Sequence, residues 1–358
     1  MKTIRAFFCC LAMCTSVGAA QEPPLWPGKH LFISVGGASL TADERAMVAE
    51  VRPGGVVLLG PNIQDAAQTR ALIHEIKTAC GMGTGIADWP LIATDQEGGR
   101  INRLKLDNAP AAQEIGARGD AADAAAVGRR YGEACRSWGI GVAFAPVLDV
   151  LEENTGSVIG SRAFGHDPAV VTQMGLAFAG GLMGGGVIPV AKHYPGHGAV
   201  RQDSHHEPAV LDGDGAQLEK HVQPFRSAAA WGMPGIMVGH IAVPALEPPG
   251  HRKRPASLSP VLIRDTLRGK MDYKGVIITD DISMGAVGPE RGEATVRALE
   301  AGCDAVIVFG NVAQLRAAAA AIEAAVETGR LSRTTLEESA RRLDEWQAHI
   351  REAGSAAR

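Results

Sequence analysis

Short apolar runs alternate with longer segments of helical periodicity along the chain from residue 30 onward. Several of the runs are unbroken, Val276-Ile277-Ile278 among them, which is typical of strands buried on both faces of a parallel sheet. We expect eight strands, at residues 30–35, 55–59, 91–95, 141–150, 187–193, 235–240, 275–280 and 304–309. The intervening periodicity predicts helices at residues 42–51, 65–78, 120–138, 168–183, 215–231 and 312–328.

The eightfold alternation of strand and helix predicts an α/β fold, a single (β/α)8 TIM barrel. The alternative is a doubly wound open sheet, which would carry a G-x-G-x-x-G turn after its first strand. Val35-Gly36-Gly37-Ala38-Ser39 lacks that spacing. Residues 334–350 continue with one amphipathic pattern, which predicts a C-terminal helix. We therefore expect one barrel domain over residues 21–358 and no second domain.

The first twenty residues have the organisation of a secretory signal peptide. Lys2 and Arg5 supply positive charge, residues 6–17 are largely apolar, and the small residues 18–20 provide a cleavage site. This pattern predicts a mature protein that is periplasmic or secreted.

The apolar run of this leader is too short to cross a bilayer, so we expect no stable membrane insertion of the mature form. A lipid anchor at Cys14 is not expected either, because Met13 is bulky where a lipoprotein box has a small residue. Three cysteines lie outside the leader: Cys80, Cys135 and Cys303. Their odd number and wide spacing predict buried thiols rather than a disulfide framework.

Composition narrows the range of partners. The formal net charge is −4, the pI is near 6.3, and lysine and arginine are scattered along the chain. We therefore expect no nucleic-acid partner. The sequence is silent on oligomeric state, and we assume a monomer.

Polar residues follow most of the predicted strands. In a barrel of this kind the functional site gathers at the carboxyl ends of the strands, where the loops open on one face. The strand-end residues that we expect to share a pocket are Asp95, Arg103, Arg162, Lys192, His193, His240, Asp280 and Asp281.

Asp280 is the sharpest single candidate because it follows directly on an apolar strand, whose backbone would hold it rigidly. Such a carboxylate suits a nucleophile or a metal ligand. Asp281 competes for the same role. Because side chains alternate along a strand, we expect one of the two acids to be structural.

The stretch from Lys192 to His206 contains four histidines, and its glycines and proline forbid a regular helix. Asp203 and His205 lie two residues apart in it, so both side chains can point the same way. A carboxylate that orients an imidazole makes it a useful general acid near neutral pH. A solvated loop with an incidental acid is the plainer alternative.

Two other classes of protein stay open at this point. Histidines at 193, 197, 205, 206 and 240 could form a zinc site in a metal-dependent hydrolase, but the first strand lacks an H-x-H motif. A non-catalytic sugar-binding module would need neither a dyad nor a strand-end carboxylate. We expect no metal and no cofactor.

Five motifs together resemble glycoside hydrolase family 3, and within it the single-domain β-N-acetylglucosaminidases, over about residues 30 to 350. The motifs are Asp95-Gln96-Glu97-Gly98-Gly99-Arg100, Ala145-Pro146-Val147-Leu148-Asp149-Val150, Ile159-Gly160-Ser161-Arg162-Ala163-Phe164-Gly165, residues 192–206, and Ile278-Thr279-Asp280-Asp281-Ile282-Ser283-Met284. The resemblance implies a (β/α)8 barrel that binds small carbohydrates and removes terminal β-linked N-acetylglucosamine from peptidoglycan fragments or chitooligosaccharides.

By that resemblance Asp280 is the nucleophile of a retaining mechanism, His205 the general acid/base and Asp203 its dyad partner. It further implies that a group of residues holds the sugar hydroxyls: Asp95, Arg103, Arg162, Lys192 and His193. A histidine acid departs from the usual pair of carboxylates. Since a neutral histidine does not repel phosphate, a phosphorylase of the same family is an alternative, and so is a β-glucosidase.

The chain departs from the family pattern at the rim and at its N-terminus. Pro61 stands where an arginine is common, and the loop between His205 and Pro208 is one residue shorter. The signal peptide is also unusual, because many of these enzymes are cytoplasmic.

Overall fold

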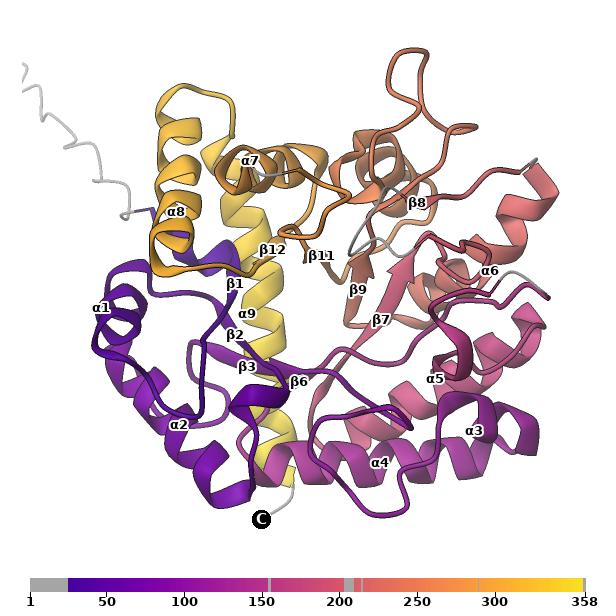
Figure 1. Ribbon diagram of the computed structural model, residues 1–358, viewed down its shortest axis with the longest axis horizontal. Coiled ribbons are helices and arrows are strands. Elements are labelled where there is room, and N and C mark those ends of the chain that lie inside the picture. The colour runs from indigo at the N-terminus through magenta and orange to yellow at the C-terminus, as the bar shows by residue number, and fades with distance from the viewer. Residues whose placement is uncertain (1–24, 154–155, 203–208, 214, 289, 357–358) are drawn as a thin grey trace, which may run out of the picture.

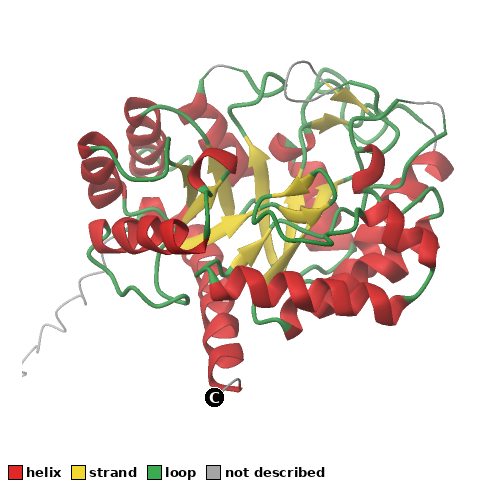
Figure 2. Cartoon of the chain, turned by 60° about the horizontal axis from the view of Figure 1, so that its bottom comes forward, coloured by secondary structure: helices red, strands yellow, loops and turns green. Residues whose placement is uncertain are grey.

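The computed structural model describes residues 25–153, 156–202, 209–213, 215–288 and 290–356. Eight parallel strands close into a barrel in the order β1-β12-β11-β9-β7-β6-β3-β2 (Figures 1 and 2). Their bounds are β1 (Leu31–Ser34), β2 (Gly55–Leu58), β3 (Leu91–Thr94), β6 (Val142–Ala143), β7 (Ile188–Tyr194), β9 (Gly235–Val238), β11 (Val276–Asp281) and β12 (Ala305–Val308). Each lies within or overlaps one predicted run, so the predicted TIM barrel is confirmed.

Helices surround the barrel, as Figure 2 shows. The described helices are α1 (Ala42–Val51), α2 (Ala66–Ala79), α3 (Ala112–Arg118), α4 (Ala121–Ser137), α5 (Pro168–Gly184), α6 (Gly215–Trp231), α7 (Arg291–Ala301), α8 (Val312–Glu327) and α9 (Arg333–Ala356). Side-chain caps explain where several of them begin. Thr41 forms a capping box with Glu44 at α1, and Asp65, Asp120 and Asp167 accept main-chain N–H groups at α2, α4 and α5.

Short elements complete the chain. The described residues include four single turns of 3-10 helix: η1 (Pro27–His30), η2 (Gly60–Asn62), η3 (Gly160–Arg162) and η4 (Ala256–Leu258). Another element, η5 (Val261–Lys270), is a π-helix. Two small sheets of described residues lie outside the barrel: β4 (Gln96–Gly98) with β5 (Ile101–Asn102), and β8 (Ala209–Val210) with β10 (Ile241–Ala242).

The fourth predicted strand is much shorter than expected. The pattern predicts a strand over residues 141–150, whereas β6 ends at Ala143. Pro146 has no N–H to donate to a ladder. Its carbonyl still accepts from the Lys192 N–H at 3.0 Å, and Val147 forms an isolated bridge with Lys192. The chain therefore stays beside β7 without being a regular strand.

The long helix α9 closes the amino-terminal end of the barrel and passes behind the strands in Figure 1. Trp346 packs edge-on against Phe32 of β1 with ring centroids 6.2 Å apart, and its indole N–H donates to the Pro234 carbonyl at 2.9 Å. Asp304, fully buried before β12, accepts from Arg268 and from Arg342 of α9. These contacts place the C-terminal helix opposite the functional end.

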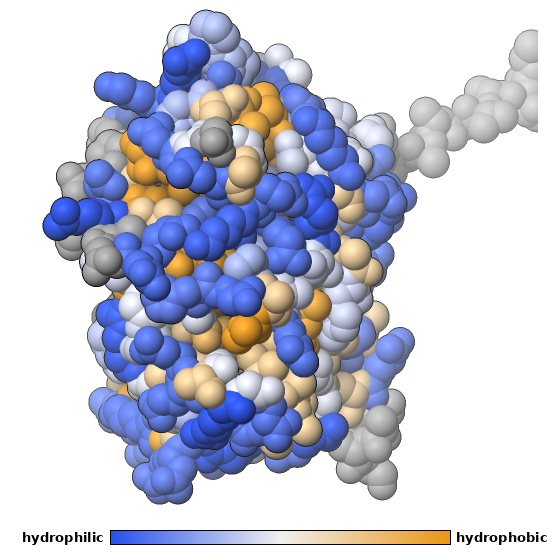
Figure 3. Space-filling view, turned by 90° about the vertical axis from the view of Figure 1, so that its right-hand side faces the viewer, coloured by the Kyte–Doolittle hydropathy of each residue, from blue (hydrophilic) through white to orange (hydrophobic). Residues whose placement is uncertain are grey.

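The three cysteines among the described residues, Cys80, Cys135 and Cys303, are free and buried, as predicted. In the described part of the chain, no helix is long and apolar enough to cross a membrane. Figure 3 shows a largely hydrophilic face on which apolar residues form small patches. Two large apolar side chains are exposed among the described residues, Trp231 at 43% and Leu246 at 39%.

Candidate active site

A cavity of about 440 Å³ opens at the carboxyl ends of the barrel strands. All five residues predicted to hold a sugar line it, together with Asp280: Asp95, Arg103, Arg162, Lys192 and His193. Its apolar lining comes from the strands and the loops that follow them: Val57, Leu59, Ile101, Phe144, Val158, Met237, Met284, Ile307 and Phe309. Charged groups and apolar surface in one concave site suit a small polar ligand with apolar faces.

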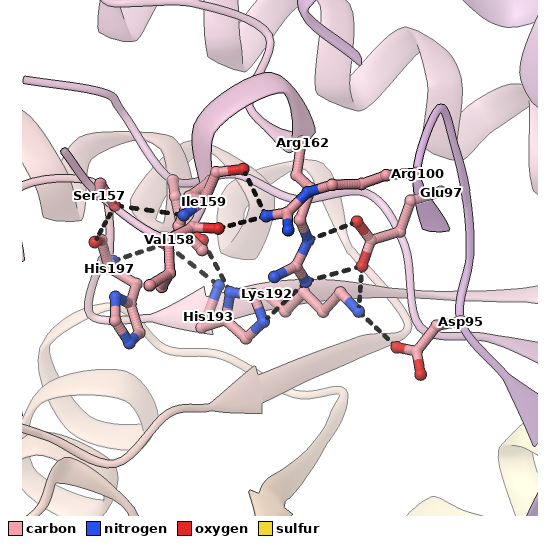
Figure 4. Close-up of polar contacts among 11 residues, drawn as sticks. Asp95, Glu97, Arg100, Ser157, Val158, Ile159, Arg162, Lys192, His193 and His197 are labelled. Atoms are coloured by element: carbon pink, nitrogen blue, oxygen red, sulfur yellow. Dashed lines mark hydrogen bonds and ion pairs between the residues drawn. The ribbon is translucent and has the colours of Figure 1, made fainter. Parts of the chain in front are cut away.

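Lys192 is the buried centre of the charged wall (Figure 4). Its ammonium lies 2.5 Å from Asp95 Oδ1 and 2.6 Å from Glu97 Oε1. Burial alone would lower the pKa of Lys192, but the attraction of Asp95 and Glu97 outweighs it and the pKa is raised. Lys192 therefore stays charged.

Glu97 joins Lys192 to Arg162. The Arg162 guanidinium donates two bonds to the Glu97 carboxylate, from Nε at 2.7 Å and from Nη2 at 2.8 Å. Burial alone would raise the pKa of Glu97, yet the two cations lower it to about 2. This bidentate pair fixes the plane of the guanidinium, which otherwise has free rotation on a long side chain.

The hairpin of β4 and β5 aims Glu97 at this cluster. Gly98 and Gly99 have φ of +90° and +52°, a region that favours glycine, and a Cβ on Gly98 would lie 2.3 Å from the Pro110 carbonyl oxygen. Arg100 donates from the hairpin to the carbonyls of Val158 and Ile159, the latter at 3.2 Å. It thereby holds the segment that enters η3 and carries Arg162 (Figure 4).

His193 is held by Asp149. Its Nδ1 lies 2.7 Å from Asp149 Oδ2, and its Nε2 lies 3.4 Å from Arg162 Nη2. Because a guanidinium only donates, Nε2 is the acceptor and the proton sits on Nδ1. The other Asp149 oxygen accepts from the His197 N–H at 2.6 Å. Burial would raise the pKa of Asp149, but His193 beside it lowers the pKa.

Asp280 and Asp281 both border the cavity. Strict alternation predicts opposite sides, but the pairing of β11 with β12 shifts register between Ile278 and Asp281. The Asp281 carboxylate accepts from the main-chain N–H groups of Ser283 and Phe309, at 3.0 and 2.9 Å, and from the Ser283 hydroxyl. Asp281 is thus engaged in holding the backbone.

The Asp280 carboxylate is kept in its ionised form. It accepts from the Asp281 N–H at 2.9 Å. Burial would raise the pKa of Asp280, but the nearby histidines His193 and His240 outweigh burial and the pKa is lowered. Burial raises the pKa of Asp281. Of the two acids, Asp280 is therefore the better anion at neutral pH.

Two predicted residues, Asp203 and His205, lie outside the described residues, as does His206. The described part of the same loop, residues 195–202, contains the buried His197. Within the described ranges, no group of three or more histidine, cysteine, aspartate or glutamate side chains is placed to hold a metal ion.

Glu97 and Asp149 are site residues to which sequence reasoning assigned no role. Both lie in motifs that were recognised, but an acid near a strand end is a weak signal by itself. Their partners are 65 and 44 residues away in sequence.

Asn62 holds the rim of the site beside Pro61. Its side-chain amide donates to the carbonyls of Val35 and Gly37, both at 2.9 Å, and so joins the first two loops. These two hydrogen bonds do not involve Pro61.

The mouth of this TIM barrel combines strand-end carboxylates with cations that pair with them. This arrangement is typical of barrel enzymes that act on polar small molecules. The chain belongs to glycoside hydrolase family 3. Residues 28–345 match the model of the glycosyl hydrolase family 3 N-terminal domain. The predicted family is confirmed, and the chain is a glycoside hydrolase.

Curated relatives agree with this assignment. A protein of Chromobacterium violaceum named β-hexosaminidase is 34% identical over 339 residues, which cover 90% of each chain. A β-hexosaminidase of Stenotrophomonas maltophilia is 36% identical over 292 residues, covering 78% of this chain and 82% of that one.

Solved structures share the fold. A family 3 β-N-acetylglucosaminidase from Paenibacillus sp. superposes with a TM-score of 0.85 at 33% identity, covering 91% of this chain and 62% of that longer one. A β-N-acetylhexosaminidase from Beutenbergia cavernae gives a TM-score of 0.80 at 26% identity, covering 90% of this chain and 98% of that one.

Proposed function

We propose that this chain is a retaining β-N-acetylglucosaminidase that removes terminal non-reducing β-linked N-acetylglucosamine from peptidoglycan fragments or chitooligosaccharides. The observation that carries the proposal is that the Asp280 carboxylate, partly buried and with a lowered pKa, lines the same cavity as the Asp95–Lys192–Glu97–Arg162 cluster. The names of the relatives support the choice of sugar.

The cluster has the composition that a sugar ring requires. Hydroxyl groups both donate and accept, so a site that holds them needs donors and acceptors at fixed positions. Lys192 has three N–H groups, of which Asp95 and Glu97 engage two among the described residues. Arg103 also lines the cavity, and its buried Nε has no partner among the described residues.

The reaction proceeds in two displacements. In the first, an Asp280 carboxylate oxygen bonds to the anomeric carbon while the glycosidic bond breaks, and His205 transfers a proton to the departing oxygen. In the second, water attacks the anomeric carbon, His205 takes a proton from that water, and Asp280 leaves. Two inversions retain the configuration. Asp203 stabilises the imidazolium form of His205.

The nucleophile is tested by Asp280→Asn. We expect kcat/KM for a nitrophenyl N-acetylglucosaminide to fall roughly 10⁴- to 10⁶-fold, because an amide cannot form the glycosyl-enzyme. Asp272→Asn is the matched control, since this aspartate is exposed just before β11 and should leave the rate unchanged. Near-normal activity of folded Asp280→Asn would refute the assignment.

Substrate class and acceptor are tested with wild-type enzyme. Turnover of N-acetylglucosaminyl-anhydromuramic acid and chitobiose, measured side by side, ranks the two candidate substrates. The rates on the nitrophenyl glycosides of N-acetylglucosamine and of glucose show which sugar the site prefers. The same reactions in phosphate buffer should release free sugar. Release of sugar 1-phosphate would instead show a phosphorylase.

A further inference from the structure

His240 is a buried histidine beside the site that the proposed reaction does not use. It follows β9 by two residues and is 1% exposed. Its Nε2 lies 2.9 Å from the main-chain oxygen of Asp281, and its Nδ1 lies 2.7 Å from the Ser257 hydroxyl. Because a carbonyl oxygen only accepts, Nε2 carries a proton. In the neutral ring, Nδ1 then accepts from Ser257.

These contacts fix the peptide units on both sides of Asp281. Its N–H donates to Asp280 Oδ1, and its carbonyl accepts from His240. The regular pairing of β9 with β11 ends at Val238 and Thr279, one residue before Asp280. The His240 side chain therefore continues the connection between these two strands past the point where the main-chain pairing stops.

Ser257 is itself firmly placed. It is fully buried in η4, and its N–H donates to the Gly239 carbonyl at 3.2 Å. A histidine whose second nitrogen is engaged by a fixed hydroxyl has its ring plane and tautomer set. Gly239, in turn, donates to the Tyr194 carbonyl at the end of β7 at 2.9 Å.

We propose that His240, oriented by Ser257, is a positioning residue that holds the Asp281 peptide and so aims the Asp280 carboxylate at the anomeric carbon. The inference rests on the proposed function, in which Asp280 is the nucleophile. A nucleophile must be held close to its attack geometry, and a displacement of 1 Å can cost about 100-fold in rate.

His240 also supports the ionised form of Asp280 through the peptide that it holds. The Asp281 N–H donates to Asp280 Oδ1, and this bond lowers the pKa of that carboxyl. Among the described residues, the other charged or titratable groups that face the carboxylate are His193, His197 and Lys192, and Asp281 is the neighbouring acid. Removing His240 loosens the Asp281 peptide and weakens its bond to Asp280. The pKa of Asp280 should then rise.

His240→Leu tests the inference against a matched control, His30→Leu. His30 is also buried, at 2%, and also bonds a main-chain carbonyl, that of Asp304 at 2.8 Å, but it lies at the amino-terminal end of the barrel. Both variants lose a buried histidine, and both should unfold at lower urea concentration than wild type.

The two variants should differ in catalysis. In folded His240→Leu we expect kcat/KM to fall roughly 10- to 100-fold and the acid limb of its pH profile to move to higher pH, because that limb reports the ionisation of the free enzyme's carboxylate. His30→Leu should leave both unchanged. An acid limb and kcat/KM that stay at wild-type values in folded His240→Leu would overturn the inference.

Two further variants keep the inference testable if His240→Leu does not fold. His240→Gln keeps an N–H donor for the Asp281 carbonyl and should recover part of the lost rate. Ser257→Ala should lower kcat/KM in the same direction as His240→Leu, and wild-type kinetics in Ser257→Ala together with no recovery in His240→Gln would overturn the inference. Activity of Asp280→Asn, by contrast, would refute the proposed function itself.

Discussion

Glu97 is an unusual side chain because a buried cation, Lys192, and a partly buried one, Arg162, share its carboxylate. Lys192 is 2% exposed and Arg162 is partly buried, and neither could be removed from water without a counter-ion. Well-packed apolar residues often replace a buried ion pair with no loss of stability. Such a replacement would also remove the donors and acceptors at the cavity wall, so we interpret the cluster as retained for binding.

The effect of Glu97 on stability should depend on pH in a defined direction. Its pKa falls from 4.5 in the unfolded chain to about 2 in the folded protein. A lowered pKa gives stability that is fully present above pH 4.5 and is lost as the pH falls toward 2. We expect Glu97→Gln to lower the free energy of unfolding by about 3–5 kcal/mol at pH 7, and by less at pH 3.5.

Urea unfolding of both proteins at the two pH values measures this difference. The control is Glu293→Gln, which removes an exposed glutamate paired with Arg330 and should cost about 0–1 kcal/mol. A loss for Glu97→Gln that is equal at pH 7 and pH 3.5 would contradict the prediction.

His205→Ala should separate substrates by their leaving groups. We expect kcat/KM for an unactivated disaccharide to fall roughly 10²- to 10⁴-fold, because its departing oxygen needs a proton. The nitrophenolate of a nitrophenyl glycoside leaves with little protonation. We therefore expect kcat/KM for that substrate, which reports the glycosylation step, to fall much less. Steady-state kinetics on both substrates measures the contrast, and equal losses would argue against His205 as the acid.

The sequence was sufficient to predict which residues at strand ends share the pocket, but not which residues hold them in place. Asp95, Lys192 and Asp280 could be placed in one pocket because the carboxyl ends of parallel strands meet at one face. Glu97 and Asp149 could not, because their roles depend on which distant side chain each one meets. The register shift in β11 likewise arises from tertiary pairing and has no sequence signal.

At the scale of elements, length and strong periodicity decided what the sequence could predict. The six helices expected between strands are all present, whereas α3 and α7 were missed. Helix α3 has only seven residues. The buried face of α7 consists mainly of small residues, with Val296 and Leu299 as the larger apolar side chains, so the amphipathic signal is weak. The π-helix η5 (Val261–Lys270) has a different period from the 3.6 residues that such a search uses.

The C-terminal helix α9 should contribute to stability and not to catalysis. Trp346 is 2% exposed and contacts Phe32 and the Pro234 carbonyl at the closed end of the barrel. We expect Trp346→Ala to lower the free energy of unfolding by about 3–5 kcal/mol while KM stays unchanged.

Urea unfolding and steady-state kinetics of the variant measure the two effects. Trp231→Ala is the control, since this tryptophan at the end of α6 is 43% exposed. Its truncation should change the stability by no more than about 0.5 kcal/mol. A raised KM in Trp346→Ala at a temperature where it is folded would show that α9 communicates with the cavity.

At the scale of the whole molecule, the candidate active site lies at one end of the barrel and the closing helix α9 lies at the other. The charged cavity opens at the carboxyl ends of the strands. Helix α9 packs against the amino ends through Trp346, and Figure 1 shows it passing behind the strands. Parallel strands connected by helices put every βα loop on the same face. This is why a sequence with the right alternation predicts the location of the site even where individual contacts cannot be predicted.

We propose that the chain is exported, which would determine the glycan that the enzyme meets. A positive start, an apolar run and small residues before position 21 are the three parts that a signal peptidase substrate requires. Expressed in full in a Gram-negative host, the protein should appear in the periplasmic fraction with Gln21 as its first residue, as N-terminal sequencing would show. Ala20→Phe should block cleavage, because the residue before the cut must be small. Recovery of uncleaved wild-type chain from the cytoplasm would place the enzyme with internal muropeptide turnover, whereas export favours glycans of the cell wall or its surroundings.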